Sequence, residues 1–238
     1  LCAGIGADFR ALTRRDATDR AWGPVLAVWQ GHAADPEIRH RGSSGGAVTA
    51  LALFALQTGL ARGVAHVAAR KDDPRRNEAV ISRSRAELLR GAGSRYAQAS
   101  PAEALGQIAA GSELVTFIGK PCDVATVSRA ASADPALAAK IPLTIAIFCA
   151  GAPTLRATDR LLSSLGMPEG ATPTALRYRG EGWPGLMKAR WRDASGAETE
   201  SPGIPYAKGW GEILQADRRW RWGPRRGCRW LLYTSRRG

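Results

Sequence analysis

One serine- and glycine-rich segment has the residue types that bind phosphate groups. It comprises Ser43, Ser44, Gly45 and Gly46, and it lies directly before an apolar run that begins at Ala47. Glycines let backbone N–H groups approach a ligand closely, serine hydroxyls donate hydrogen bonds, and a helix N-terminus favours anions. The segment matches neither the Walker A loop nor the GxGxxG fingerprint. It is a candidate phosphate site, and the alternative is an ordinary helix cap.

A second candidate is the segment RYRGEGWPG, which begins at Arg177. Arg177 and Arg179 would lie on one face of a strand, next to Gly180 and an aromatic residue. Such guanidinium groups could clamp a phosphate or stack on a planar ring. Arg95 and Tyr96 offer similar chemistry earlier in the chain. For both segments the alternative is a solvated strand edge with a structural turn.

Lys120 and Cys122 follow an apolar, β-rich run, and Cys149 ends a second such run. Ligands of α/β proteins bind beyond the carboxyl ends of parallel strands, so Lys120 could contact a cofactor and Cys122 a cofactor or a metal. The alternatives are a solvated lysine and cysteines that act as small buried hydrophobic residues. Two cysteines do not complete an iron–sulfur site, which uses four thiolates.

Hydrophobic periodicity and turn signals predict the elements that position these residues. Their alternation indicates an α/β fold: a mixed, partly parallel sheet with flanking helices, plus a smaller β-rich C-terminal region. We expect strands at 25–29, 64–69, 114–118, 143–149, 174–179 and 186–192, and a charged loop at 35–42. We expect helices at 47–58 (buried all round), 83–89 (capped by Ser82 or Ser84), 124–131 (capped by Asp123) and 155–165.

Composition and charge exclude several classes of protein. Hydrophobic residues make up 45% of the 238 residues and charged residues 23%, as in ordinary globular chains. No apolar run reaches the ~18–20 residues of a membrane helix, and no signal-peptide pattern occurs, so we expect a cytoplasmic protein without a membrane partner. The net charge is +13, but residues 218–238 carry eight arginines and no acid. Because the excess is terminal, a basic nucleic-acid-binding module is only a second alternative.

Five segments, taken in order, resemble the coenzyme F-420 hydrogenase/dehydrogenase beta-subunit family. They are RGSSGGAVTALALFALQTG, SRYAQASP, VTFIGKPCDVA, IAIFCAGAP and LRYRGEGWPG. Each segment is a weak signal alone, and their shared order and compatible spacing carry the resemblance. The resemblance spans residues 23–220. The family also includes a vinyl reductase and a hydroxymethyl reductase of chlorophyll metabolism.

The resemblance implies a flavoprotein oxidoreductase that binds FAD and a [4Fe-4S] cluster. Such a protein passes electrons between a redox carrier, either the deazaflavin coenzyme or ferredoxin, and a substrate or a hydrogenase or dehydrogenase partner subunit. By motif position, FAD would be contacted from the segments 43–46, 95–96, 177–180 and from Lys120. Cys122 and Cys2 would be the candidate cluster ligands, with Cys149 a weaker one. The resemblance names no catalytic acid or base.

Both ends of the chain depart from the family pattern. Members often begin with CAGCGxC, whereas this chain begins LCAGIGAD, so Cys2 is kept and Ile5 and Asp8 replace cysteines. Members carry WRCxxCPD near the end, whereas residues 220–228 read WRWGPRRGC. We therefore expect a truncated or frame-disrupted chain in which most cluster ligands are missing and flavin binding survives. The alternative function is a degraded, non-catalytic member that binds flavin or a partner only.

These observations divide the chain into four parts. Residues 1–22 correspond to the remnant of a cysteine-rich, ferredoxin-like start, and residues 23–170 to an α/β flavin-binding domain. Residues 171–220 correspond to the start of the family's C-terminal domain, and residues 221–238 form an atypical tail rich in arginine and tryptophan. The candidate flavin contacts thus come from both central parts.

Overall fold

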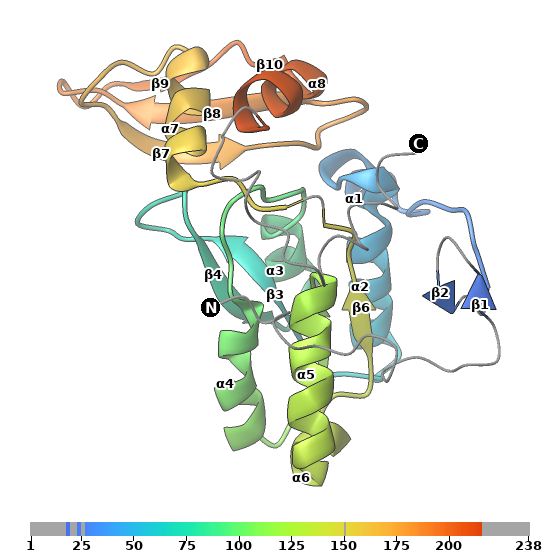
Figure 1. Cartoon of the computed structure of the whole chain (residues 1–238). Coiled ribbons are helices and arrows are strands. Elements are labelled where there is room, and N and C mark those ends of the chain that lie inside the picture. The colour runs from blue at the N-terminus through green and yellow to red at the C-terminus, as the bar shows by residue number, and fades with distance from the viewer. Residues whose placement is uncertain (1–17, 20–22, 25–26, 150, 216–238) are drawn as a thin grey trace.

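The structure is a computed structural model that describes residues 18–19, 23–24, 27–149 and 151–215. Two β-sheets, each covered by helices, form two lobes that lie one above the other in Figure 1. The first lobe holds β3 (Gly63–Ala69), β4 (Asn77–Ser82), β5 (Val115–Gly119) and β6 (Thr144–Ala146), with α1 (Pro36–Arg41), η1 (Ser44–Gly46), α2 (Ala47–Gln57), α3 (Arg85–Arg90), η2 (Pro101–Glu103), α4 (Ala104–Ala110), α5 (Pro121–Ala133) and α6 (Pro135–Ala139). The second lobe holds α7 (Leu155–Ser164), β7 (Thr172–Arg177), β8 (Leu186–Arg192), β9 (Glu198–Glu200), β10 (Ile204–Pro205), α8 (Tyr206–Lys208) and the π-helical turn η3 (Gly209–Leu214). Two short strands, β1 (Thr18–Asp19) and β2 (Gly23–Pro24), pair with each other.

The sheet of the first lobe has the strand order β4-β3-β5-β6. β3, β5 and β6 are parallel, and β4 pairs with β3 in the antiparallel sense. All five residues of β5 are buried, because helices cover both faces of this part of the sheet. Ile118 packs with α2 and α3 on one face, whereas Phe117 packs with α4, α5 and α6 on the other. This alternation follows from the two-residue period of a strand.

The sheet of the second lobe is antiparallel. β8 pairs with β7 along one edge and with β9 and β10 along the other. Helix α7 packs on this sheet, where Leu161 and Leu162 contact a core that includes Tyr178, Met187 and Trp191. The mixed, partly parallel sheet and the smaller β-rich C-terminal region that we predicted are therefore confirmed.

Several predicted elements need correction. Residues 35–42 contain a helix rather than a loop, because the Asp35 carboxylate accepts hydrogen bonds from two N–H groups of the first turn and Pro36 starts the helix. Residues 27–29 are not in a strand. The hydrophobic pattern of the sequence also did not predict strand β4. Asp123 does not precede helix α5: the helix begins at Pro121, with Lys120 at the N-cap.

Helix α2 is the clearest failure of burial prediction. Its sequence is apolar nearly all round, yet Leu51 is 52% exposed and Phe54 is 58% exposed. Only one stripe, which includes Ala52 and Ala55, is fully buried. β6 is also shorter than expected and lies at the edge of its sheet, where Thr144 and Ala146 are exposed. No helix in the described part of the chain has the length and hydropathy needed to cross a membrane.

Candidate functional site

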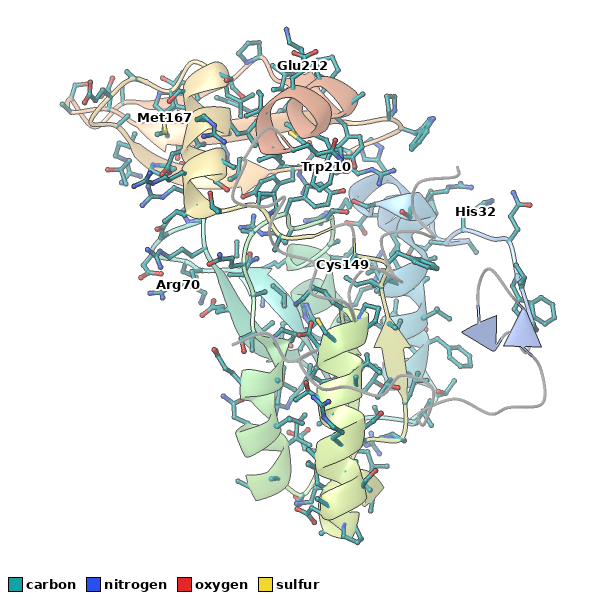
Figure 2. All side chains as sticks on the ribbon, viewed as in Figure 1. His32, Arg70, Cys149, Met167, Trp210 and Glu212 are labelled. Carbon is teal, nitrogen blue, oxygen red and sulfur yellow. The ribbon has the colours of Figure 1, made fainter. Side chains whose placement is uncertain are left out.

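The two lobes meet beyond the carboxyl ends of the parallel strands. In Figure 1 the arrowhead of β6 points toward the second lobe, and the N-terminal end of α2 lies on that same side of the first lobe. Figure 2 shows Cys149, which follows β6, between the two lobes. The carboxyl edge of a parallel sheet is where α/β proteins bind ligands. The segments that the sequence singled out after β5 and β6 therefore lie at this boundary.

A groove of about 450 Å³ opens where α1 and η1 face the loop that follows β7. We call it the interlobe groove, and its volume lies within the ~300–1,000 Å³ of typical ligand pockets. Its lining contains no aspartate or glutamate. The complete lining is His32, Pro36, Arg39, His40, Gly42, Ser43, Ser44, Gly45, Arg179, Gly180, Gly182 and Trp183. Two arginines without an acid make this groove electropositive.

The Ser43–Gly46 segment has backbone donors beside the groove that no protein group accepts from among the described residues. Ser44, Gly45 and Gly46 have φ values of 51°, 67° and 72°, so three successive residues are left-handed. The Gly46 N–H donates to the Ser43 carbonyl at 3.0 Å, whereas the Ser44 and Gly45 N–H groups have no acceptor among the described residues. A Cβ on Gly45 would lie 2.8 Å from the His32 Cβ, which explains the glycine. Adjacent unpaired N–H groups in such a turn favour an anion.

Arg179 supplies a guanidinium group that no carboxylate neutralises among the described residues. Its Cζ lies 4.7 Å from the centre of the Tyr206 ring and 5.4 Å from the centre of the Trp183 ring. Contact with these two rings holds the cation at the groove without an ion pair. Arg39, on α1, likewise has no acidic partner among the described residues, and its Nη1 lies 3.4 Å from Nδ1 of His32.

Arg177 and Gly180, the other two predicted residues of this segment, lie against the last residue of α1. Arg177 forms an ion pair with Glu181 at 3.1 Å, and its Nη1 donates to the carbonyl of Arg41 at 3.3 Å. Gly180 lies so close that a Cβ would be 2.7 Å from the same Arg41 oxygen. The structure therefore brings Gly180 into the groove with Ser43, Ser44, Gly45 and Arg179. Gly46 is buried behind the groove, and Arg177 is bound by protein partners.

Arg95 and Tyr96 lie between the lobes, where protein groups take up their polar atoms. The Arg95 guanidinium donates to the Asn77 side chain at 2.9 Å and to the carbonyls of Leu176 at 2.8 Å and Pro74 at 2.5 Å. Burial lowers the pKa of Arg95. The Tyr96 hydroxyl donates to the Tyr206 hydroxyl at 3.3 Å. These contacts give both residues a role in joining the lobes.

Lys120 and the cysteines lie at the carboxyl edge of the first sheet. The Lys120 ammonium is 2.6 Å from the buried Asp123 carboxylate, which also accepts from the Lys120 N–H. Cys122 and Cys149 are half-buried and do not form a disulfide. Cys2 lies outside the described residues. Within the described ranges, no group of three or more His, Cys, Asp or Glu side chains could hold a metal ion.

Sequence reasoning missed the contribution of α1 to the site. Arg39 reaches the groove because residues 36–41 are helical, whereas the sequence pattern predicts a charged loop there. The signal was present in the Asp35–Pro36 pair, which is typical of a helix start. Tyr206, which packs under Arg179, had no signal of its own in the sequence.

The fold and the groove define a two-lobed α/β protein with an electropositive site between its lobes. Residues 28–105 match the N-terminal domain of the coenzyme F420 hydrogenase/dehydrogenase beta subunit, and residues 112–229 match its C-terminal domain. The chain therefore belongs to the coenzyme F420 hydrogenase/dehydrogenase beta-subunit family, as the resemblance predicted.

A solved structure supports the same fold. It is the xenon-derivatised F420-reducing [NiFe] hydrogenase complex from Methanosarcina barkeri, one chain of which matches with a TM-score of 0.53 and 21% identity. The match covers 75% of this chain and 60% of that chain. Curated protein sequences gave no match.

Proposed function

We propose that this protein is a flavin-dependent oxidoreductase subunit that binds FAD with its diphosphate in the interlobe groove. It would pass electrons between a redox carrier, the deazaflavin coenzyme or ferredoxin, and a substrate or partner subunit. The observation that carries the proposal is the composition of the groove. Among the described residues, the guanidinium groups of Arg39 and Arg179 have no carboxylate partner and two backbone N–H groups have no protein acceptor, and the lining contains no acid.

The residues of the groove fit the charged part of a dinucleotide. The N–H groups of Ser44 and Gly45 can donate to one phosphate, and the guanidinium groups of Arg39 and Arg179 can neutralise both. The absence of carboxylates from the lining removes the repulsion that an anion would otherwise meet. When bound, a flavin joins two-electron hydride chemistry to single-electron transfer, and the protein supplies position and electrostatics.

The described residues do not fit a [4Fe-4S] cluster. Such a cluster takes four thiolates, and no metal-binding group of three or more side chains occurs in the described ranges. The proposal therefore assigns no electron-transfer step to a cluster. The same observation favours a second candidate function, a family member that binds flavin or a partner without catalysis.

The partners are part of the proposal. The family membership and the matching chain of a hydrogenase complex support a hydrogenase or dehydrogenase partner subunit. This chain spans about 60% of the length of that hydrogenase chain.

The test is to purify the chain without oxygen, record its visible absorption spectrum, and assay flavin and iron in the same sample. We expect stoichiometric flavin, and we expect Arg179→Ala to weaken FAD binding about 10- to 100-fold because a charge-assisted contact is lost. Arg160→Ala, which removes an exposed arginine of α7, is the matched control and should bind FAD normally. A chain that binds no flavin would overturn the proposal. Bound flavin that no carrier reduces would select the non-catalytic alternative.

A further inference from the structure

Trp183 is a large aromatic residue that the fold leaves exposed at the rim of the interlobe groove. Its side chain is 83% exposed and lines the groove. The loop that carries it is held by backbone hydrogen bonds on both sides. The Gly182 N–H donates to the His40 carbonyl at 3.1 Å, and the Tyr206 N–H donates to the Gly185 carbonyl at 3.3 Å. The loop therefore keeps Trp183 at the groove although the indole contributes little to the core.

The neighbour of Trp183 is a cation rather than an apolar group. The Arg179 Cζ lies 5.4 Å from the Trp183 ring centre and 4.7 Å from the Tyr206 ring centre. Arg179 thus contacts both rings, and the high exposure of Trp183 leaves most of the indole open to solvent. An exposed aromatic surface beside a candidate anion site is typical of a platform on which a ligand ring stacks.

We propose that Trp183 is the stacking platform for the isoalloxazine ring of the flavin, an assignment that rests on the proposed function. The Ser44 and Gly45 N–H groups, Arg179 and Trp183 all line one groove. A ring joined to the bound diphosphate through a short linker can therefore reach the indole. The indole is electron-rich and the oxidised flavin ring is electron-poor, so their stacking is favourable.

The test compares three probes, FAD, FMN and ADP, on the full chain and on Trp183→Ala and Trp183→Phe. We expect Trp183→Ala to weaken FAD and FMN binding about 5- to 100-fold, the effect of losing one aromatic stack. ADP binding should stay unchanged, because ADP has no flavin ring. Trp183→Phe should keep most of the affinity. The fluorescence of bound FMN should rise in both variants, because phenylalanine stacks but does not quench a flavin as an indole does.

Trp29→Ala is the matched control, since Trp29 is 90% exposed and does not line the groove. It should change neither affinity nor FMN fluorescence, and its melting temperature should match that of Trp183→Ala. Unchanged FMN affinity and fluorescence in Trp183→Ala would overturn this inference while the flavin proposal stands. Weaker ADP binding with normal FMN binding would overturn it as well, because Trp183 would then stack on adenine. If the unmodified chain binds neither flavin, the proposed function itself fails.

Discussion

The guanidinium group of Arg95 donates a hydrogen bond of 2.8 Å to the backbone carbonyl of Leu176, and this bond joins the two lobes. The same guanidinium group also donates to Asn77 and Pro74 of the first lobe, so one side chain bonds acceptors in both lobes. An ion pair of 3.1 Å between Arg75 and Asp159 crosses the same boundary. The interlobe groove thus has walls from two lobes whose relative position is fixed by polar contacts.

Replacing Arg95 should destabilise the whole fold. Arg95→Met keeps the length of the side chain but removes the guanidinium donor from the carbonyls of Leu176 and Pro74. We expect the free energy of unfolding to fall by about 2–4 kcal/mol, since hydrogen bonds from a charged donor are lost and buried acceptors stay unpaired. Urea denaturation measures the change. Arg160→Met, on an exposed face, should cost less than about 0.5 kcal/mol, and equal losses in the two variants would contradict this role for Arg95.

The buried imidazole of His66 should make stability depend on pH. Its Nδ1 is 3.2 Å from the Val67 carbonyl, which only accepts, and its Nε2 is 2.8 Å from the Ser82 hydroxyl. Nδ1 therefore carries the proton, and Nε2 accepts from Ser82. Burial lowers the pKa of His66 below its ordinary value of 6.5. Below that pH the unfolded chain binds a proton that the folded chain resists.

Proton linkage gives the direction in which stability changes with pH. The contribution of neutral His66 to the free energy of unfolding should be fully present above pH 6.5. It should fall as the pH drops from 6.5 toward the lowered pKa of His66. Carboxylates with lowered pKa values, such as Asp73, add a loss only at lower pH. Urea denaturation at a series of pH values between about 7 and 5 checks this window. The slope should flatten in His66→Gln and persist in His32→Gln; a slope that His66→Gln leaves unchanged would place its origin elsewhere.

Gly45 should matter for the ligand more than for the fold. Gly45→Ala places a Cβ 2.8 Å from the His32 Cβ in a residue with φ of 67°. Gly59→Ala is the control, because Gly59 has φ of 74° but no atom within 4 Å of the added Cβ. Left-handed strain should cost each variant roughly 1–2 kcal/mol of stability, and Gly45→Ala should lose more because its Cβ also meets His32. Only Gly45→Ala should also weaken FAD binding, as isothermal titration would show; equal FAD affinities would remove Gly45 from the site.

Arg179→Lys should separate charge from shape. The ammonium group keeps the positive charge, but it cannot stack on Tyr206 and Trp183 as a planar guanidinium does. We therefore expect FAD affinity between those of the unmodified chain and Arg179→Ala, with a loss of roughly 3- to 10-fold. Titration of each variant with FAD at two salt concentrations measures these affinities. An Arg179→Lys variant that binds as tightly as the unmodified chain would mean that charge alone is needed.

Local patterns determined much of this protein. The five buried residues of β5 read as a continuous apolar run, and Ser84 caps α3 through a reciprocal pair with Glu87. The helix at 155–164 and the antiparallel strands β7 and β8 also follow from periodicity. Such features depend on neighbours in the chain, so a sequence specifies them directly. The candidate phosphate segment at Ser43–Gly46 belongs to the same class, because its glycines permit a left-handed turn that few other residues adopt.

Only the tertiary structure decided which polar groups have partners. Arg95, Arg177 and Arg179 have the same chemistry in the sequence, yet backbone carbonyls take up Arg95, Glu181 and a carbonyl take up Arg177, and Arg179 faces the groove. Arg39 joined the site because α1 packs beside the loop of the second lobe. A guanidinium group can reach many acceptors, and the packing of distant elements selects among them. The sequence by itself therefore determined most of the strands, the Ser84 cap and the family, and the packing of the two lobes decided which cations could meet a ligand.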